Sequence, residues 1–287
     1  MKGNIIWIAS YPKSGNTWFR IFLSCLLEET ASEPDINQIG TDGIASSRML
    51  FEQCTGLDSA NLTPKEIAAL RPAVYNYLSA TLQNDLKIKV HDAYQILLNG
   101  IPLFPVTATK AACYLIRNPL DIAASYAHHC GDSLDETIDK MNNSDWSLGK
   151  QTLNATAQLP HFLGSWCHHV KSWMESTHFP VCLLRYEDMH LQPLETFSKA
   201  VVAIGIEKSP EEITRAIKAS SFEKLKKQEQ ESGFRERPHT SSFFFRSGKI
   251  GSWRDSLTEK QASLIIENHT ETMRQYGYLD SRGNPTF

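Results

Sequence analysis

Short apolar runs alternate with amphipathic stretches along the chain. Four runs rich in Ile, Val, Leu and Ala indicate buried strands at residues 5–9, 88–91, 112–117 and 181–186. After the first run, Phe19, Phe22, Leu23 and Leu26 recur at helical spacing, which predicts a helix over residues 17–29. Strands separated by helices are typical of a parallel sheet covered by helices. The pattern therefore predicts an α/β fold, with residues 1–287 in a single domain.

Each predicted strand ends at a polar residue that could face a ligand. These residues are Ser10, His91, Arg117 and Tyr186. Ligands of open parallel sheets bind beyond the carboxyl ends of the strands. A lone histidine at a strand end is commonly structural. Beside anion-binding loops, however, His91 becomes a candidate general base, because its ordinary pKa lies near working pH.

The segment between the first strand and its helix has the composition of a phosphate-binding loop. Gly15 allows close backbone approach, Lys13 brings a positive charge, and donors are expected from Ser14, Asn16 and Thr17. The order differs from a Walker A loop, in which the lysine follows the last glycine and a Mg²⁺-binding Ser or Thr comes next. The alternative is an ordinary strand–helix turn with a solvated lysine.

A second candidate anion site follows the third strand. Asn118 is a suitable N-cap and Pro119 a suitable first helical residue, so a helix should begin there. Arg117 can then bind a phosphate through both arms of its guanidinium, with Ser125 two turns further along the helix. Taken alone, Arg-Asn-Pro is a weak motif.

Composition and charge exclude several classes of protein. The chain has 29 Lys and Arg against 32 Asp and Glu, which gives a net charge of −3 and argues against nucleic-acid binding. No apolar run is long enough to span a membrane, and the first run is too short for a signal peptide. We expect a cytoplasmic protein with reduced cysteines. His161, Cys167, His168 and His169 resemble a ligand set, but we expect a wet helix face and no metal site.

The stretch 220–254 is locally basic, with eight Lys or Arg against four Glu. Residues 224–231 are predicted to form a solvated helix face. Phe243, Phe244 and Phe245 would be costly in an exposed loop, so we expect them to cover something.

Three of these segments resemble motifs of cytosolic-type sulfotransferases, which use 3′-phosphoadenosine 5′-phosphosulfate (PAPS). Residues 11–18, Tyr-Pro-Lys-Ser-Gly-Asn-Thr-Trp, resemble the 5′-phosphosulfate loop of that family. Residues 115–126 resemble its 3′-phosphate motif, and residues 246–254 its C-terminal R-K-G-x-x-G-D-W-K loop. The motifs follow the family order over nearly the whole chain, which is similar to bacterial members, some of which sulfate natural products. The resemblance implies the P-loop-like sulfotransferase fold.

The resemblance also implies roles for individual residues. Lys13 would contact the sulfuryl-transfer centre and the 5′-phosphate would be held by Ser14, Gly15, Asn16 and Thr17. The adenine would lie among Trp18, Tyr186, Ser220 and Phe222. The 3′-phosphate would be bound by Arg117, Ser125, Phe245, Arg246, Ser247 and Gly248. His91 would be the catalytic base, with Lys89 as the neighbouring family lysine.

These roles predict in-line sulfuryl transfer from PAPS to a small-molecule hydroxyl, or to an amine or carbamate nitrogen, with PAP as product and no metal. Ser247 stands where the family motif has lysine, and Lys249 could compensate for the missing charge. The family dimerisation motif has no clear match, since Leu257-Thr258-Glu259 keeps only the threonine, so monomer and homodimer both stay open.

The acceptor pocket is expected from three loops. These are residues 40–56 with Met49 and Phe51, residues 92–106 with Tyr94 and Phe104, and residues 126–132. Asp92, Asp132 and Asp135 could pair with a cationic acceptor, or could be ordinary solvated loop residues. The alternative functions are a P-loop small-molecule kinase and a non-catalytic nucleotide-binding protein. The first lacks the Walker A order, and the second predicts loss of Lys13 or His91, both of which are present.

Overall fold

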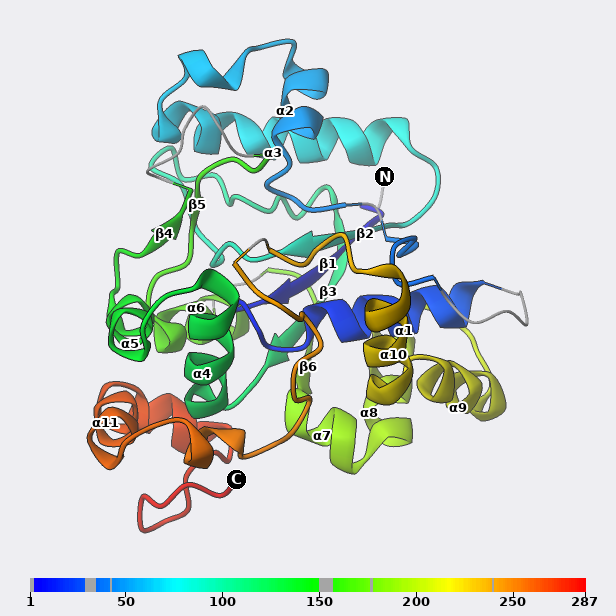
Figure 1. The fold of residues 1–287 in the computed structure, drawn as a ribbon. Coiled ribbons are helices and arrows are strands. Elements are labelled where there is room, and N and C mark those ends of the chain that lie inside the picture. The colour runs from blue at the N-terminus through cyan, green and yellow to red at the C-terminus, as the bar shows by residue number, and fades with distance from the viewer. Residues whose placement is uncertain (1–2, 29–34, 42, 150–156, 176–177, 239) are drawn as a thin grey trace.

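A four-stranded parallel sheet forms the centre of the molecule (Figure 1). The computed structural model describes residues 3–28, 35–41, 43–149, 157–175, 178–238 and 240–287. The strand order is β2 (Leu86–Val90), β1 (Ile5–Ser10), β3 (Thr109–Ile116) and β6 (Val181–Arg185). All neighbours pair in parallel. The predicted strands and the parallel sheet are confirmed, with boundaries that differ by at most three residues.

Alternation along β1 divides the core between the two faces of the sheet. Ile6 and Ile8 pack against α1 (Asn16–Leu27), α8 (Pro193–Ala203) and α9 (Pro210–Ala219). Ile5 and Trp7 face the opposite core. The helices of that side are α3 (Pro64–Thr81), α4 (Pro119–Cys130), α6 (Trp166–Glu175) and α11 (Glu259–Gln275). Because β1 is buried on both faces, it is a continuous apolar run, as parallel strands usually are.

The remaining elements surround this frame. They are α2 (Arg48–Thr55), η1 (Ser59–Asn61), α5 (Leu134–Asn142), α7 (Tyr186–Leu191), α10 (Phe222–Ser232), η2 (Ser252–Asp255) and the antiparallel pair β4 (Ser147–Leu148) and β5 (His161–Phe162). Capping boxes begin α3, α5, α9 and α11. The Thr258 that remained from the dimerisation motif is the N-cap of α11. Among the described residues, no helix is long and apolar enough to cross a membrane.

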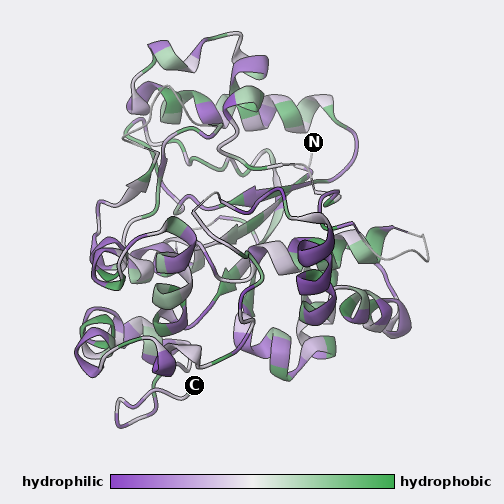
Figure 2. Ribbon diagram, in the orientation of Figure 1, coloured by the Kyte–Doolittle hydropathy of each residue, from purple (hydrophilic) through white to green (hydrophobic). Residues whose placement is uncertain are grey.

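Two expectations about helix faces hold only in part, since His168 on α6 is exposed and Lys226, Lys227, Gln230 and Glu231 form an exposed face of the segment 224–231. His169 on α6 is fully buried and His161 is 4% exposed, so these histidines do not lie on a wet helix face. They bond inside the protein, and no group of three metal-ligating side chains gathers in the part of the chain that the structure describes. α10 is coloured mostly hydrophilic in Figure 2, yet it buries Leu225 and Glu229 against the loop that follows it.

Candidate functional site

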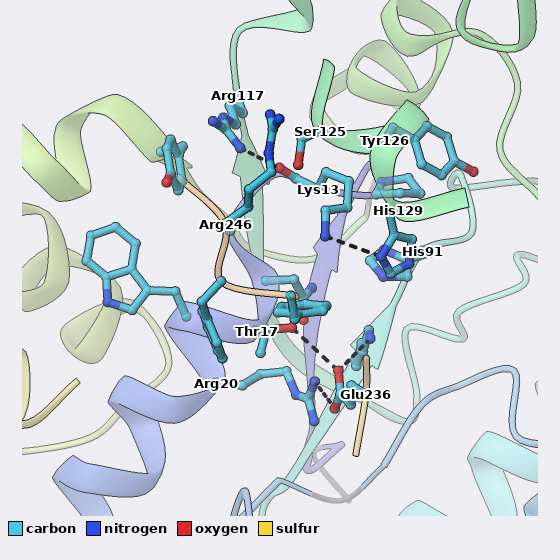
Figure 3. Close-up of a pocket in the computed structure, with 18 of the residues that line it drawn as sticks. Lys13, Thr17, Arg20, His91, Arg117, Ser125, Tyr126, His129, Glu236 and Arg246 are labelled. Atoms are coloured by element: carbon cyan, nitrogen blue, oxygen red, sulfur yellow. Dashed lines mark hydrogen bonds and ion pairs between the residues drawn. The ribbon is translucent and has the colours of Figure 1, made fainter. Parts of the chain in front are cut away.

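A cavity of about 640 Å³ opens at the carboxyl ends of the strands (Figure 3). The sheet order places His91, Ser10, Arg117 and Tyr186 side by side at that edge, since each residue ends or follows one of four adjacent strands. Three of the four line the cavity, and Ser10 lies fully buried behind it. Three of the four strand-end side chains therefore converge on one cavity, and Ser10 does not reach it.

The loop between β1 and α1 turns sharply around Gly15, whose φ is 95°. A Cβ on Gly15 would lie 2.7 Å from the Tyr186 ring, so glycine permits both the turn and the contact. Ser14 is fully buried, and its hydroxyl has no partner. The side chain of Asn16 donates to the Ile8 carbonyl and to Ser10 Oγ, which leaves only its backbone N–H to face an anion.

Lys13 extends into the cavity (Figure 3), and no carboxylate of the described residues forms an ion pair with it. Its Nζ lies 3.4 Å from His129 Nδ1 and 4.1 Å from the centre of the Phe244 ring. Burial, followed by the positive charges of Arg117 and Lys89, lowers the pKa of Lys13 to about 7. The cavity therefore holds a lysine that gains its charge most readily when an anion binds beside it.

Arg117 is 8% exposed and is held in place from three sides. Its guanidinium lies 4.1 Å from the centre of the Tyr186 ring and donates to the backbone carbonyls of Lys13 and Lys249 at 3.2 and 3.3 Å. Its Nε has no partner. Ser125, Arg246 and Ser247 line the same part of the cavity. The expected compensation by the Lys249 side chain is not seen, because Lys249 contributes its carbonyl and is not among the lining residues.

Aromatic rings form the wall beside Arg117. Trp18, Tyr186 and Phe222 all line the cavity. A Cβ on Gly248 would lie 2.5 Å from the Phe222 ring, so the chain can only pass there as glycine. Ser220 departs from the prediction, because its hydroxyl turns into α9 and donates to the Ala216 carbonyl. Its own carbonyl accepts from Trp18 Nε1 at 2.9 Å, so Ser220 holds the tryptophan from behind the cavity wall.

His91 has a defined tautomer. Its Nδ1 lies 2.9 Å from the Ser10 carbonyl, which can only accept, so Nδ1 carries the proton. Burial, together with the nearby charge of Lys89, holds the pKa of His91 well below 6.5. The imidazole of His91 is therefore neutral at neutral pH, and its Nε2 keeps a free lone pair.

The network behind His91 fixes its backbone. His169 Nε2 lies 3.0 Å from the His91 carbonyl, and Tyr114 Oη lies 2.8 Å from the other nitrogen of His169. Asp92 forms a buried ion pair with Arg71 at 2.6 Å. The contacts to the His91 carbonyl and to the Asp92 side chain fix the backbone on both sides of the peptide bond between them, which positions the imidazole.

Two of the three phenylalanines, Phe244 and Phe245, cover other groups. Glu229 of α10 accepts from the backbone N–H groups of Phe244 and Phe245 at 2.7 and 2.8 Å, which anchors the segment. Phe244 lies over Lys13, and Phe245 is 5% exposed beside Phe234. Phe243 stays 45% exposed.

Sequence reasoning missed the charged lining residues Arg20, Arg235 and Glu236, and it included His129 only as part of the predicted loop 126–132. Glu236 is paired with Arg20 at 2.7 Å and with Lys89 at 3.1 Å. The only signal in the sequence was the position of Arg20, one helical turn after Thr17. Nothing local distinguished Glu236 from surface residues.

The rest of the cavity wall differs from the predicted acceptor loops. Phe51, Tyr94 and Phe104 are core residues, and Met49 is 65% exposed outside the cavity. The lining on this side consists of Gly43, Ile44, Tyr126, His129, Cys130, Leu148, Gln158 and His161. Of the predicted loops, residues 126–132 contribute most.

The aspartates considered for a cationic acceptor all have partners within the chain. Asp92 is paired with Arg71, and Asp132 with Lys140 at 2.6 Å. Asp135 accepts from Gln261 at 2.7 Å. The hypothesis that these aspartates bind an acceptor is therefore not supported.

The sheet, the loop before α1 and the cation-lined cavity define an α/β protein with a cavity suited to an anionic ligand at the carboxyl edge of its sheet. The family model "Sulfotransferase domain" matches residues 4–277, and the chain belongs to this family. It is a sulfotransferase, an enzyme that transfers sulfuryl groups.

Curated relatives agree over most of the chain. Sulfotransferase 1B1 of dog is 27% identical over 88% of this chain and 78% of its own length. Flavonol 3-sulfotransferase of Flaveria bidentis is 25% identical over 91% and 79%.

Solved structures share the fold. Mouse sulfotransferase SULT7A1, complexed with PAP, superposes with a TM-score of 0.62 at 21% identity, covering 96% of this chain and 86% of that one. Retinol dehydratase, in complex with androsterone and PAP, gives 0.63 at 19% identity, covering 96% and 82%.

Proposed function

We propose that this sulfotransferase takes its sulfuryl group from PAPS and delivers it to a hydroxyl of a small molecule, with His91 as general base and Lys13 at the leaving phosphate. The observation that carries the proposal is that Lys13 and the neutral His91 line one cavity at the carboxyl edge of the sheet. We call the wall formed by residues 13, 15–18, Arg117, Ser125 and 245–248 the donor end. The wall formed by residues 43–44, 126, 129–130, 148, 158 and 161 is the acceptor end.

The charge of the cavity suits a polyanionic donor. Six cationic side chains and one carboxylate line it among the described residues: Lys13, Arg20, Lys89, Arg117, Arg235, Arg246 and Glu236. PAPS carries a 3′-phosphate and a 5′-phosphosulfate. Arg117 and Arg246 suit the first, and the N-terminus of α1 with Lys13 suits the second. The buried Ser14 hydroxyl and Arg117 Nε, both without partners, are the unsatisfied donors that such an anion would complete.

Sulfuryl transfer needs a general base beside the attacking oxygen and a positive charge beside the departing phosphate. The lone pair on His91 Nε2 can take the proton of the acceptor hydroxyl as its oxygen attacks sulfur. As the bond from sulfur to the phosphate oxygen breaks, negative charge grows on the departing phosphate, and a protonated Lys13 stabilises it. The acceptor class follows from the acceptor end, which combines apolar Ile44 and Leu148 with the polar rings of Tyr126 and His129. A small apolar molecule with a hydroxyl fits that combination.

A titration of the purified protein tests the donor assignment. PAP should raise the melting temperature without added metal, because a ligand that binds only the folded state stabilises it by RT ln(1 + [L]/Kd). ATP with Mg²⁺ should have little effect. Stabilisation by ATP and Mg²⁺ alone would overturn the assignment in favour of a kinase, and stabilisation by neither would indicate a non-catalytic protein. Transfer of ³⁵S from labelled PAPS to a panel of phenols and alcohols then tests the acceptor class.

A further inference from the structure

Glu236 is the single carboxylate among the described residues that line the cavity, and it points to the cationic side chains below Lys13 (Figure 3). Its two oxygens are divided between two partners. Oε1 accepts from Arg20 at 2.7 Å, and Oε2 lies 3.1 Å from Lys89 Nζ. Oε2 also lies 3.5 Å from Thr17 Oγ1, in the first turn of α1. A negatively charged group therefore already occupies the anion-binding end of α1.

The chain around Glu236 holds this carboxylate in place. The backbone N–H of Arg235 donates to Asn37 Oδ1 at 2.8 Å, and Arg237 N–H donates to the Phe234 carbonyl at 3.1 Å. Burial would raise the pKa of Glu236, but the charges of Lys89 and Arg20 outweigh it and lower the pKa to about 2. Glu236 is thus a carboxylate at neutral pH.

The cations around Glu236 have few other partners. Arg20 is 5% exposed and otherwise donates to Thr41 Oγ1 at 3.0 Å. The Lys89 side chain is 16% exposed, and within the described part of the chain its ion pair is with Glu236. Arg20 and Lys89 can therefore bind an anion, and the carboxylate of Glu236 is the anion that they bind in this structure.

We infer that Thr17, Arg20 and Lys89 form an anion subsite that Glu236 fills in the empty enzyme and that the 5′-phosphosulfate of the donor takes over when it binds. The inference rests on the proposed function. A phosphosulfate hydrogen-bonded to Thr17 would place its oxygens next to the Glu236 carboxylate, and like charges at that range repel strongly in a partly buried site. The carboxylate therefore has to leave for the donor to bind, and Arg20 and Lys89 then bind the donor directly.

Nucleotide affinity of a single variant tests this exchange. Glu236→Gln keeps the shape of the side chain and removes the charge that competes with the donor. PAP should bind this variant about tenfold more tightly or better, by isothermal titration calorimetry, which lies within the usual 5- to 150-fold range of couplings between two ligands. Adenosine 3′-phosphate lacks the 5′ group, so its affinity should not change. Glu231→Gln is the matched control, because it removes the same charge from an exposed position on α10.

Each other outcome is informative. Unchanged or weaker PAP binding to Glu236→Gln, with normal binding to the unmodified protein, would overturn the exchange and make Glu236 part of the donor site. Equal tightening of PAP and adenosine 3′-phosphate would also overturn it, because the whole covering segment would then have loosened. If neither protein binds PAP, the proposed function fails and the inference fails with it. The double variant Glu236→Gln/Arg20→Gln should lose the gain, which assigns Arg20 to the subsite.

Discussion

The donor end and the acceptor end of the cavity are built in different ways. At the donor end, the functional groups come directly after β1 and β3 or from the segment 245–248, and each motif is a continuous stretch of sequence. At the acceptor end, single residues arrive from separate places: Gly43 and Ile44, the side of α4, β4 and residues 158 and 161. A site built from strand ends can be recognised locally, whereas a site assembled from single positions can only be recognised once the chain is folded.

His91 lies where the two ends meet, and its removal should have the largest effect. We expect His91→Ala to lower kcat by roughly 10²–10⁴-fold, the usual loss of a general base, with PAP affinity nearly unchanged. Steady-state kinetics with labelled PAPS and direct PAP titration measure the two quantities. His178→Ala, at an exposed position, is the control. Activity within a few-fold of the unmodified enzyme would refute the role of His91 as base.

The buried Arg71–Asp92 ion pair allows a stability measurement to test whether Asp92 belongs to the core or to the acceptor end. Asp92 follows His91 yet is 1% exposed, so it belongs to the core and not to an acceptor pocket. Asp92→Asn would leave the buried Arg71 charge uncompensated, and we expect it to lower the free energy of unfolding by about 3–5 kcal/mol. Asp85→Asn, which breaks a partly exposed pair with Lys110, should cost no more than about 1 kcal/mol. Chemical denaturation measures the free energy of unfolding of both variants. Equal losses of unfolding free energy would contradict the assignment of Asp92 to the core.

The titration of Lys13 predicts a pH dependence confined to the donor end. The pKa of Lys13 is about 7 in the empty cavity and should rise when an anionic nucleotide binds beside it. Binding then takes up a proton above pH 7, so PAP affinity should fall as pH rises, by up to about tenfold per pH unit. Lys13→Arg should abolish this dependence, because arginine keeps its charge. Calorimetry in two buffers of different ionisation enthalpy measures the proton uptake that accompanies PAP binding. If no proton is taken up near pH 8, Lys13 does not gain a proton on binding.

The smallest effect is expected where the chain departs from the family motif. Ser247 lines the donor end next to Arg246, at the position of the family lysine. Ser247→Lys should tighten PAP binding only a few-fold, because an added cation near a partly exposed site contributes about 0.2–1 kcal/mol. Ser242→Lys, at an exposed position in the same segment, should have no effect. A loss of affinity in Ser247→Lys would mean that the lysine is excluded by shape.

The fold was predictable because its signals are local. The apolar runs of β1 and β3 and the helical spacing after Lys13 were sufficient for a parallel α/β sheet, and the polar residue after each strand marked the edge where ligands bind. The residues of the donor end were predictable for the same reason, because they lie in short motifs that are continuous in the sequence. Ser220 was an exception, because a hydroxyl can turn toward a preceding helix carbonyl instead of the cavity.

By itself, the sequence determined the class of fold, the order of the proposed phosphate-binding segments, the place of Lys13 in the loop after the first strand, and His91 and Arg117 as groups at strand ends. Only the tertiary structure decided which aromatic side chains became core, as Tyr94 and Phe104 did, and which distant charges meet, as Glu236 and Arg20 do across more than two hundred residues. The physical reason is that strand and turn preferences act between neighbours in the chain. Burial and ion pairing depend instead on where packing places residues that the sequence keeps far apart.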